Sequence, residues 1–106
     1  MVVKVKVTAY DKDGISREES VKYWLTKHAP LAKQKWGDIL KKYTISVVIS
    51  ADGVEPGYMG TAELWFNNMA DLHKFMSSPD GQQVLADNAN FARKVTMLIL
   101  EEHTIV

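Results

Sequence analysis

The chain has 106 residues, of which 46% are hydrophobic and 25% charged, a length and composition that suit one globular domain over residues 1–106. Lysine plus arginine balance aspartate plus glutamate at 13 each, and this zero net charge argues against a nucleic-acid partner, because such binding depends largely on neutralising phosphates. The absence of cysteine excludes disulfides, zinc fingers and iron–sulfur clusters, and it fits the reducing cytoplasm, where we expect the protein.

The chain begins with a predicted strand followed by a helix. Apolar and polar residues alternate over residues 3–10, which is the period of a half-buried strand. Ser16 and Glu19 have the spacing of a capping box, so a helix should start there. We expect this helix to bend or end at His28, because Pro30 has no N–H for the helical hydrogen bond and disfavours helical backbone just before it.

The middle of the chain predicts a second helical piece and a pair of strands. After the expected bend, a turn or two of helix should cover residues 31–36 and stop at Gly37. Residues 43–50 are rich in β-branched side chains and alternate as a strand. Glycine and proline mark a loop over residues 51–57, so residues 58–66 should form the partner strand.

The last third of the chain predicts two short helices and a final strand. Asn67 or Asn68 can cap the first helix, and Ser78 followed by Pro79 begins the second. Residues 94–106 should form the closing strand. The resulting order, βαββαβ, is the ferredoxin-like arrangement, an α+β fold in which a four-stranded antiparallel sheet carries its helices on one face.

The uncovered face of that sheet predicts a homodimer. Two helices cover only one face, yet Val48, Trp65, Leu98 and Leu100 should point to the other. A large exposed apolar patch is rare on a monomer, and two-fold packing of sheet on sheet would cover it. The alternative is that these are scattered surface apolar residues, which are common.

Two ionisable residues lie on apolar helical stripes, and they are the candidate catalytic residues. His28 shares its stripe with Val21, Trp24 and Leu25, and Asp87 shares one with Val84 and Phe91. If both stripes face the sheet, the carboxylate can accept a hydrogen bond from one imidazole nitrogen and leave the other as a base. The alternatives are a structural histidine at the helix bend and an Asp87 that caps its helix or pairs with Arg93 or Lys94.

Aromatic side chains are the candidates for a substrate pocket, namely Tyr10, Trp24, Tyr43, Trp65 and Phe91. Glu101 and His103 share a strand face, but two ligands are too few for a metal site, so no metal is expected. No nucleotide, flavin or metal motif is present, and we therefore expect no cofactor. No apolar run approaches the roughly 18 residues of a membrane-spanning helix, so no membrane partner is expected.

One segment has the pattern W-x-x-x-H-x-P-L, formed by Trp24, His28, Pro30 and Leu31. Other matching positions extend over nearly the whole chain: residues 16–19, Tyr23, Tyr43, Leu64, Trp65, Phe66, Asn68, Asp71, Phe75, Asp87, Phe91, Glu101 and Glu102. With these residues the chain resembles the EthD family, named for ethyl tert-butyl ether degradation, within the dimeric α+β barrel superfamily. The resemblance implies a ferredoxin-like fold and a homodimer whose two sheets form a barrel.

The resemblance also implies a role in small-molecule catabolism or secondary metabolism. EthD-like proteins accompany oxidative degradation of organic compounds, some relatives look like dehydratases or cyclases, and superfamily neighbours include muconolactone isomerase and cofactor-free monooxygenases. Their shared feature is an apolar pocket that holds a small cyclic ligand beside acid–base groups. The family's histidine corresponds to His28, and the aspartate of its second helix corresponds to Asp87.

Three functions follow as expectations. The first is a cofactor-free enzyme, an oxidoreductase, lyase or isomerase, with His28 as base and Asp87 to orient it. The second is a non-catalytic protein that binds a metabolite or serves an oxidoreductase system as an accessory. The third is a haem- or metal-binding relative, which would need a histidine lining an open cavity.

Overall fold

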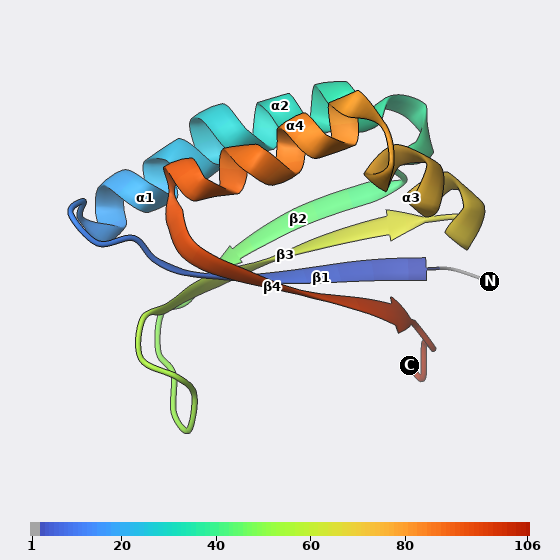
Figure 1. The fold of residues 1–106 in the computed structure, drawn as a ribbon. Coiled ribbons are helices and arrows are strands. Elements are labelled where there is room, and N and C mark those ends of the chain that lie inside the picture. The colour runs from blue at the N-terminus through green and yellow to red at the C-terminus, as the bar shows by residue number, and fades with distance from the viewer. Residues whose placement is uncertain (1–2) are drawn as a thin grey trace.

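The computed structural model describes residues 3–106 and has the expected α+β, ferredoxin-like arrangement. Its strands are β1 (Val3–Asp11), β2 (Lys42–Val47), β3 (Tyr58–Phe66) and β4 (Ala92–Glu101). Its helices are α1 (Arg17–Tyr23), η1 (Trp24–His28), α2 (Ala29–Trp36), η2 (Gly37–Ile39), α3 (Met69–Met76), α4 (Pro79–Asp87) and η3 (Asn88–Asn90). The strands form one antiparallel four-stranded sheet in the order β2-β3-β1-β4, and the helices cover one face of it (Figure 1).

The strands follow the predicted alternation, but two of them are shorter than predicted. Strand β3 has the expected bounds, and on β1 the buried Val3 and Val5 face the helices while Lys4 and Lys6 point away. The expectation of a strand over residues 43–50 is wrong at its end. After Val48, whose N–H still donates to Met59, the backbone leaves the sheet in a long loop.

The last strand also differs from its predicted range of 94–106. It begins at Ala92, because Asp11 of β1 extends the pairing to that residue. It ends at Glu101, which pairs with Val3, the first residue that the structure describes. Residues 102–106 lie beyond this pairing, and within the described residues they form no strand.

The helical segment does not end at His28, so the expectation that it bends or ends there is wrong as far as the ending is concerned. His28 has φ −69° and ψ −49°, and Ala29 has φ −60° and ψ −44°, so both are helical. Instead, η1 is a wider π-helical turn in which the N–H of Ala29 donates to the carbonyl of Trp24 five residues back. Such a turn accommodates the ring of Pro30 and its missing N–H while the chain stays helical.

The wider turn also explains the spacing of the buried residues. They recur at every fourth position of the segment: Ser20, Trp24, His28, Ala32 and Trp36. In a regular α-helix each step of four overshoots a full turn by about 40°, so such a stripe would wind around the helix. The extra residue in η1 offsets part of that drift and keeps His28 toward the sheet. Leu25, expected in the stripe, is instead 46% exposed.

Helices α3 and α4 begin at the predicted caps, and α3 packs onto the end of α2 while α4 lies alongside α2 (Figure 1). The side chain of Asn68 accepts from the N–H of Asp71, and Ser78 accepts from the N–H of Gly81. Trp36 at the end of α2 packs against Phe75 of α3 with 3.6 Å between ring centroids. These contacts close the helical layer over one end of the sheet. Within residues 3–106, none of the helices combines the length and apolarity required to cross a bilayer.

The corner between α3 and α4 requires glycine, and this gives a first testable prediction. A Cβ atom at Gly81 would overlap the backbone carbonyl of Phe75. Because backbone atoms have no rotamer to relieve the clash, we expect Gly81→Ala to lower the free energy of unfolding by about 1–3 kcal/mol. Urea denaturation measures this loss, with Gln83→Ala, at an exposed position of α4, as control. A Gly81→Ala protein as stable as the control would contradict the packing of this corner.

The open face of the sheet contains the expected apolar residues, together with charged ones. Leu98 is 55% exposed, Leu100 and Trp65 are half-buried, and Val48 lies just past the end of β2. The β1 strand contributes Lys4 to this face, opposite Trp65 and Leu100.

Lys4 is the centre of an ion network on this open face. Its ammonium lies 2.9 Å from Glu63 and 3.1 Å from Glu102, and the indole N–H of Trp65 donates to Glu102 at 2.8 Å. The hydrogen bond from Trp65, followed by that from Lys4, holds the pKa of Glu102 below its usual value. The face is therefore an apolar strip along β4 beside a polar network, rather than a uniformly apolar surface.

Candidate functional site

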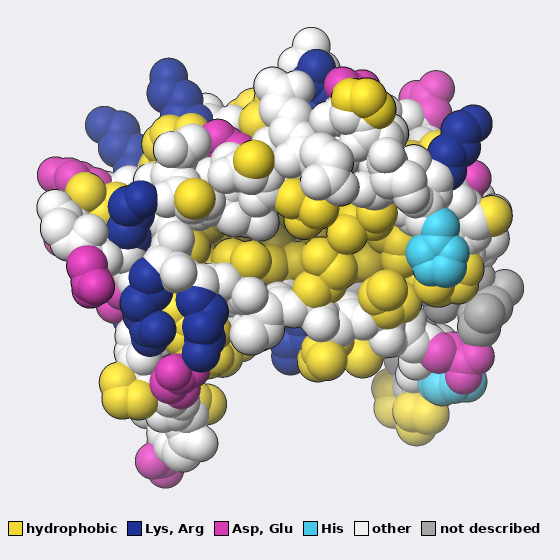
Figure 2. Space-filling model, viewed as in Figure 1, with side chains coloured by type: hydrophobic (Ala, Val, Ile, Leu, Met, Phe, Trp, Pro, Cys, Tyr) yellow, Lys and Arg dark blue, Asp and Glu magenta, His cyan; other side chains and the backbone are white. Residues whose placement is uncertain are grey.

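A cavity of about 60 Å³ lies between the helical layer and the sheet. Figure 2 shows the hollow as a band of hydrophobic side chains between the helices and the β4 edge. The sheet contributes Val5, Val7, Ala9, Tyr43, Ala62, Leu64, Val95 and Met97, and the helices and the turn after them contribute Trp24, His28, Ala32, Trp36, Leu72, Met76, Val84, Leu85, Asn88 and Phe91. It forms where the helices do not fully cover β4, on which Met97 and Ile99 remain partly exposed.

His28 and Asp87 meet beside this cavity. The Nδ1 atom of His28 lies 2.8 Å from Oδ2 of Asp87, and the histidine is 5% exposed. The histidine comes from the last residue of η1 and the aspartate from the last residue of α4, so the two helical segments meet at this pair. A carboxylate acceptor favours the tautomer in which Nδ1 carries the proton.

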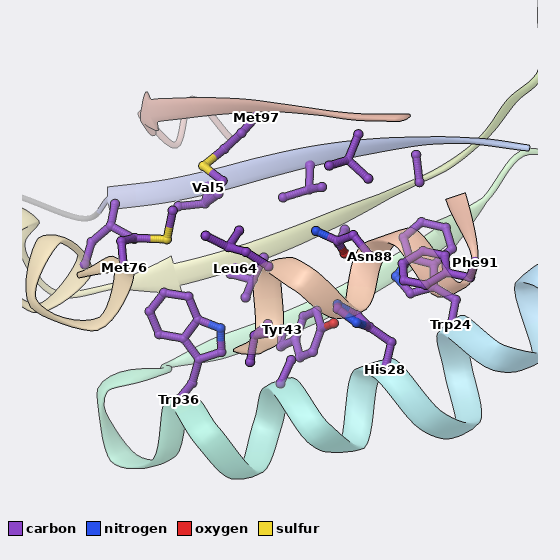
Figure 3. A pocket seen from close by; sticks show the side chains of 18 residues that line it. Val5, Trp24, His28, Trp36, Tyr43, Leu64, Met76, Asn88, Phe91 and Met97 are labelled. Atoms are coloured by element: carbon purple, nitrogen blue, oxygen red, sulfur yellow. The ribbon is translucent and has the colours of Figure 1, made fainter. Parts of the chain in front are cut away.

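The second ring nitrogen of His28, Nε2, faces the cavity. It has no hydrogen-bond partner within residues 3–106, and it is not fully buried. It therefore remains accessible from the cavity that the residue lines. Figure 3 shows the ring directed into the pocket from the helical segment. With Nδ1 protonated, Nε2 is a free acceptor for a proton.

Asp87 is held by three side chains. Besides His28, the hydroxyl of Tyr23 donates to Oδ1 at 2.8 Å and the amide of Asn90 donates to the same oxygen at 2.9 Å. Burial raises the pKa of Asp87, but the hydrogen bonds from His28, Tyr23 and Asn90 outweigh it, and the pKa lies below its usual value. The hydrogen bond to Asp87 in turn raises the pKa of Tyr23. Asp87 is thus a carboxylate at neutral pH.

Phe91 fixes the orientation of the histidine ring. Its ring centroid lies 4.9 Å from that of His28 at an interplanar angle of 54°. Trp24 in turn stacks on Phe91, with 5.4 Å between the ring centroids. Because these rings are buried, the imidazole has little freedom to turn away from Asp87.

The structure brings most of the candidate residues together. Trp24, His28, Tyr43 and Phe91 line the cavity, and Asp87 contacts His28 from outside the lining. Arg93 and Lys94, the alternative partners of Asp87, instead contact the Pro56 carbonyl at 3.0 Å and Glu55 at 2.7 Å.

Two candidates for the pocket lie elsewhere. Trp65 is on the open face of the sheet, bonded to Glu102. Tyr10 packs against Tyr58 with 5.6 Å between ring centroids, and the ammonium of Lys94 lies 4.6 Å from its ring centroid. Neither side chain lines the cavity.

Several residues of the site were not among the sequence candidates. Tyr23 and Asn90 bond to Asp87, and Trp36 and Asn88 line the cavity. The spacing of Asn90, three residues after Asp87, is a signal for a side-chain contact in a helix. Asn88 has no such signal, because the direction of its side chain depends on the change from the α-helix α4 to the tighter 3₁₀ turn η3. Among residues 3–106, no group of three or more His, Cys, Asp or Glu side chains could hold a metal ion.

Comparison with known sequences finds relatives over most of the chain. A family model described as the EthD domain matches residues 12–94. A protein of Rhodococcus erythropolis, described as an uncharacterized 11.0 kDa protein in the thcB-thcC intergenic region, is 35% identical over 85 residues, which are 79% of this chain and 81% of that protein. The relative carries no assigned activity.

Solved structures with the same fold include proteins of several kinds. An EthD family protein of Bacillus halodurans has a TM-score of 0.80 at 19% identity, covering 97% of this chain and all 100% of its own. A hydroxynitrile lyase from Passiflora edulis has a TM-score of 0.75 at 18% identity, covering 97% of this chain and 96% of its own. A dimeric ferredoxin-like protein of unknown function from Thermobifida fusca has a TM-score of 0.73 at 14% identity, covering 94% of this chain and 90% of its own. At these identities the matches establish the fold and leave the activity open.

Proposed function

The chain belongs to the EthD family, and from this membership and the geometry of its cavity we propose that it is a cofactor-independent acid–base enzyme of small-molecule catabolism or secondary metabolism. His28 would exchange a proton with a substrate carbon or oxygen next to a carbonyl or phenol. Asp87 would orient the imidazole. The observation that carries the proposal is the 2.8 Å His28–Asp87 contact, which leaves Nε2 for a molecule in an apolar cavity.

The pair has the properties that proton transfer requires. When Nε2 accepts a proton, the imidazolium forms next to the carboxylate of Asp87, which stabilises the positive charge. The hydrogen bonds from Tyr23 and Asn90 keep that carboxylate ionised and in place. Proton transfer of this kind is common to isomerases, dehydratases and cofactor-free monooxygenases, so the site supports the class of chemistry rather than one of these reactions.

The size of the cavity limits the substrate. Its volume of about 60 Å³ is well below that of pockets for drug-sized ligands, which is roughly 300–1,000 Å³. A compact molecule is therefore favoured, and a larger ring requires movement of the lining. Met76 and Met97 are the adaptable side chains of that lining, because methionine has several rotatable bonds.

The proposal is tested by proton exchange with simple probes. Cyclohexanone and cyclohex-2-enone are incubated in D₂O with the protein, and loss of their α-proton signals is followed by NMR. We expect wild type to accelerate the exchange and His28→Ala to lose the acceleration.

Mandelonitrile is a third probe, suggested by the hydroxynitrile lyase among the structural neighbours. In the cleavage of mandelonitrile a base removes the hydroxyl proton, the carbon–cyanide bond breaks, and the base returns the proton to cyanide, so that benzaldehyde and hydrogen cyanide are released. No acceleration with any probe counts against acid–base catalysis.

A second candidate function is non-catalytic binding of a metabolite, with the protein as an accessory to an oxidoreductase system. The predominantly apolar lining of the cavity favours it, because binding requires shape complementarity but no proton transfer. The same NMR samples separate the two functions. Ligand-induced shifts of cavity resonances without any exchange of probe protons indicate binding alone.

We further propose a homodimer formed through the open face of the sheet. The exposed Leu98 and half-buried Leu100 and Trp65 support it, and the similar Thermobifida fusca protein is described as dimeric. Light scattering at micromolar concentration should give a mass near twice the 12.0 kDa of the chain. Leu98→Glu should shift it to the monomer, because the new carboxylate would be desolvated in the interface. Leu25→Glu, on the helical layer, is the matched control. A wild-type monomer would contradict the proposal.

A further inference from the structure

Besides His28 and the indole N–H groups of Trp24 and Trp36, two neutral polar side chains line the cavity. The amide of Asn88 and the hydroxyl of Tyr43 both belong to residues that line it. The backbone carbonyl of Asn88 accepts from the N–H of Phe91 at 3.2 Å. Within residues 3–106, no hydrogen bond involves the side-chain amide of Asn88 or the hydroxyl of Tyr43, and neither group is fully buried.

These groups reach the cavity from separate elements. Tyr43 lies on β2, His28 ends η1, and Asn88 begins η3 directly after Asp87. Figure 3 shows all three side chains directed into the pocket. Because successive helical residues point about 100° apart, the carboxylate of Asp87 contacts Nδ1 of His28 while the neighbouring amide of Asn88 faces the cavity. One helix end thus supplies both the partner of the base and a polar group for the ligand.

The charge of the lining restricts the ligand. None of the 18 residues that line the pocket is a lysine, arginine, aspartate or glutamate. An anionic ligand would lose its hydration on entry without a fixed cation to replace it, which is costly in an apolar site. A neutral oxygen, in contrast, can accept hydrogen bonds from the amide N–H of Asn88 and from the phenol of Tyr43. Burial raises the pKa of Tyr43 to about 12, so the phenol keeps its proton at neutral pH.

We infer that Asn88 and Tyr43 form an oxygen-binding subsite beside His28, which selects compact, neutral compounds that carry a carbonyl group. The inference rests on the proposed function for its chemistry. His28 Nε2 takes a proton from the carbon next to the carbonyl, and the electron pair of that C–H bond forms a carbon–carbon double bond. The carbonyl π electrons move to the oxygen, where the two donors hold the negative charge. Return of the proton from His28 completes the cycle without a co-reactant.

Binding of matched probes to the full chain tests the subsite. Cyclohexanone and cyclohexanecarboxylate have the same ring, and their dissociation constants are measured by NMR shift titration. We expect the ketone to bind at least tenfold more tightly than the carboxylate. Asn88→Leu and Tyr43→Phe should each weaken ketone binding by about three- to tenfold, the range expected for one neutral hydrogen bond. Gln83→Leu, an exposed change on α4, should bind the ketone as wild type does.

The outcomes separate the subsite from the catalytic proposal. Equal binding of ketone and carboxylate, or unchanged ketone binding in the two variants, would overturn the subsite. Thermal melts check folding, and if Asn88→Leu does not fold, Tyr43→Phe decides, because it removes a single oxygen. A wild type that prefers the ketone but catalyses no exchange supports the subsite and contradicts the acid–base function.

Discussion

Replacing His28 by alanine should lower the rate of probe proton exchange by a factor of about 10² to 10⁴, the usual contribution of a positioned general base. The reason is geometric. The carboxylate of Asp87 holds Nδ1 of the His28 ring, and the other ring nitrogen, Nε2, faces the cavity. Alanine leaves no proton acceptor at that position. The rate is measured with cyclohexanone in D₂O at constant pH, for wild type and variant at equal concentration.

A control and a rescue experiment make this prediction specific to the cavity. His73 is an exposed histidine on α3, and His73→Ala should keep the wild-type rate. The His28→Ala substitution removes an imidazole from an enclosed site, so added free imidazole can occupy the space and should restore part of the exchange. Full activity of His28→Ala, or an equal loss in His73→Ala, would show that the proton transfer occurs elsewhere.

Asp87→Asn should reduce the same rate by about 10² or more while preserving the shape of the site. Asparagine can offer an N–H toward His28 Nδ1, which favours the tautomer with the proton on Nε2, and that nitrogen then cannot accept a proton. In a serine protease triad, the corresponding aspartate-to-asparagine change costs about 10⁴ for this reason. Asp13→Asn, in the exposed turn before α1, is the control.

Asp87→Asn should also change how stability depends on pH. Because the pKa of Asp87 is lowered in the folded protein, its carboxylate stabilises the fold above the unfolded-state value of about 3.9. This contribution is lost as the pH falls through the lower, folded-state value. We expect the variant to be less stable by about 1–3 kcal/mol at neutral pH, the cost of weakening hydrogen bonds to a charged group. The difference from wild type should shrink below about pH 4, as urea denaturation at several pH values will measure. A constant difference over this range contradicts the ionised state of Asp87.

The features that could be predicted from the sequence are those fixed by local chemistry. The side chains of Ser16, Asn68 and Ser78 cap helices because their oxygens reach backbone N–H groups a few residues on. The bounds of β3 follow from alternation between turn residues. His28 and Asp87 could be paired in advance because each lies on an apolar stripe, and both stripes must face one sheet.

The features that could not be predicted from the sequence depend on tertiary packing. The local rule for Pro30 ends a helix, but burial of Trp24, His28 and Trp36 against the sheet keeps the chain helical through a wider turn. Trp65 has its predicted place on the open face, where its indole N–H donates to Glu102, and it therefore does not line the pocket to which it was also assigned. The direction of Asn88 depends on the tightening of α4 into η3, which periodicity does not encode.

The π-helical turn at Trp24–His28 has a consequence for aligning relatives. Such a turn is equivalent to one residue inserted into a regular helix, so a homologue with an unbroken α-helix here is one residue shorter between the same two superposed ends. An ungapped alignment would then match His28 with a neighbour that points about 100° away. Surveys of which family members retain the histidine should therefore compare superposed backbones, allowing a single-residue gap at this turn.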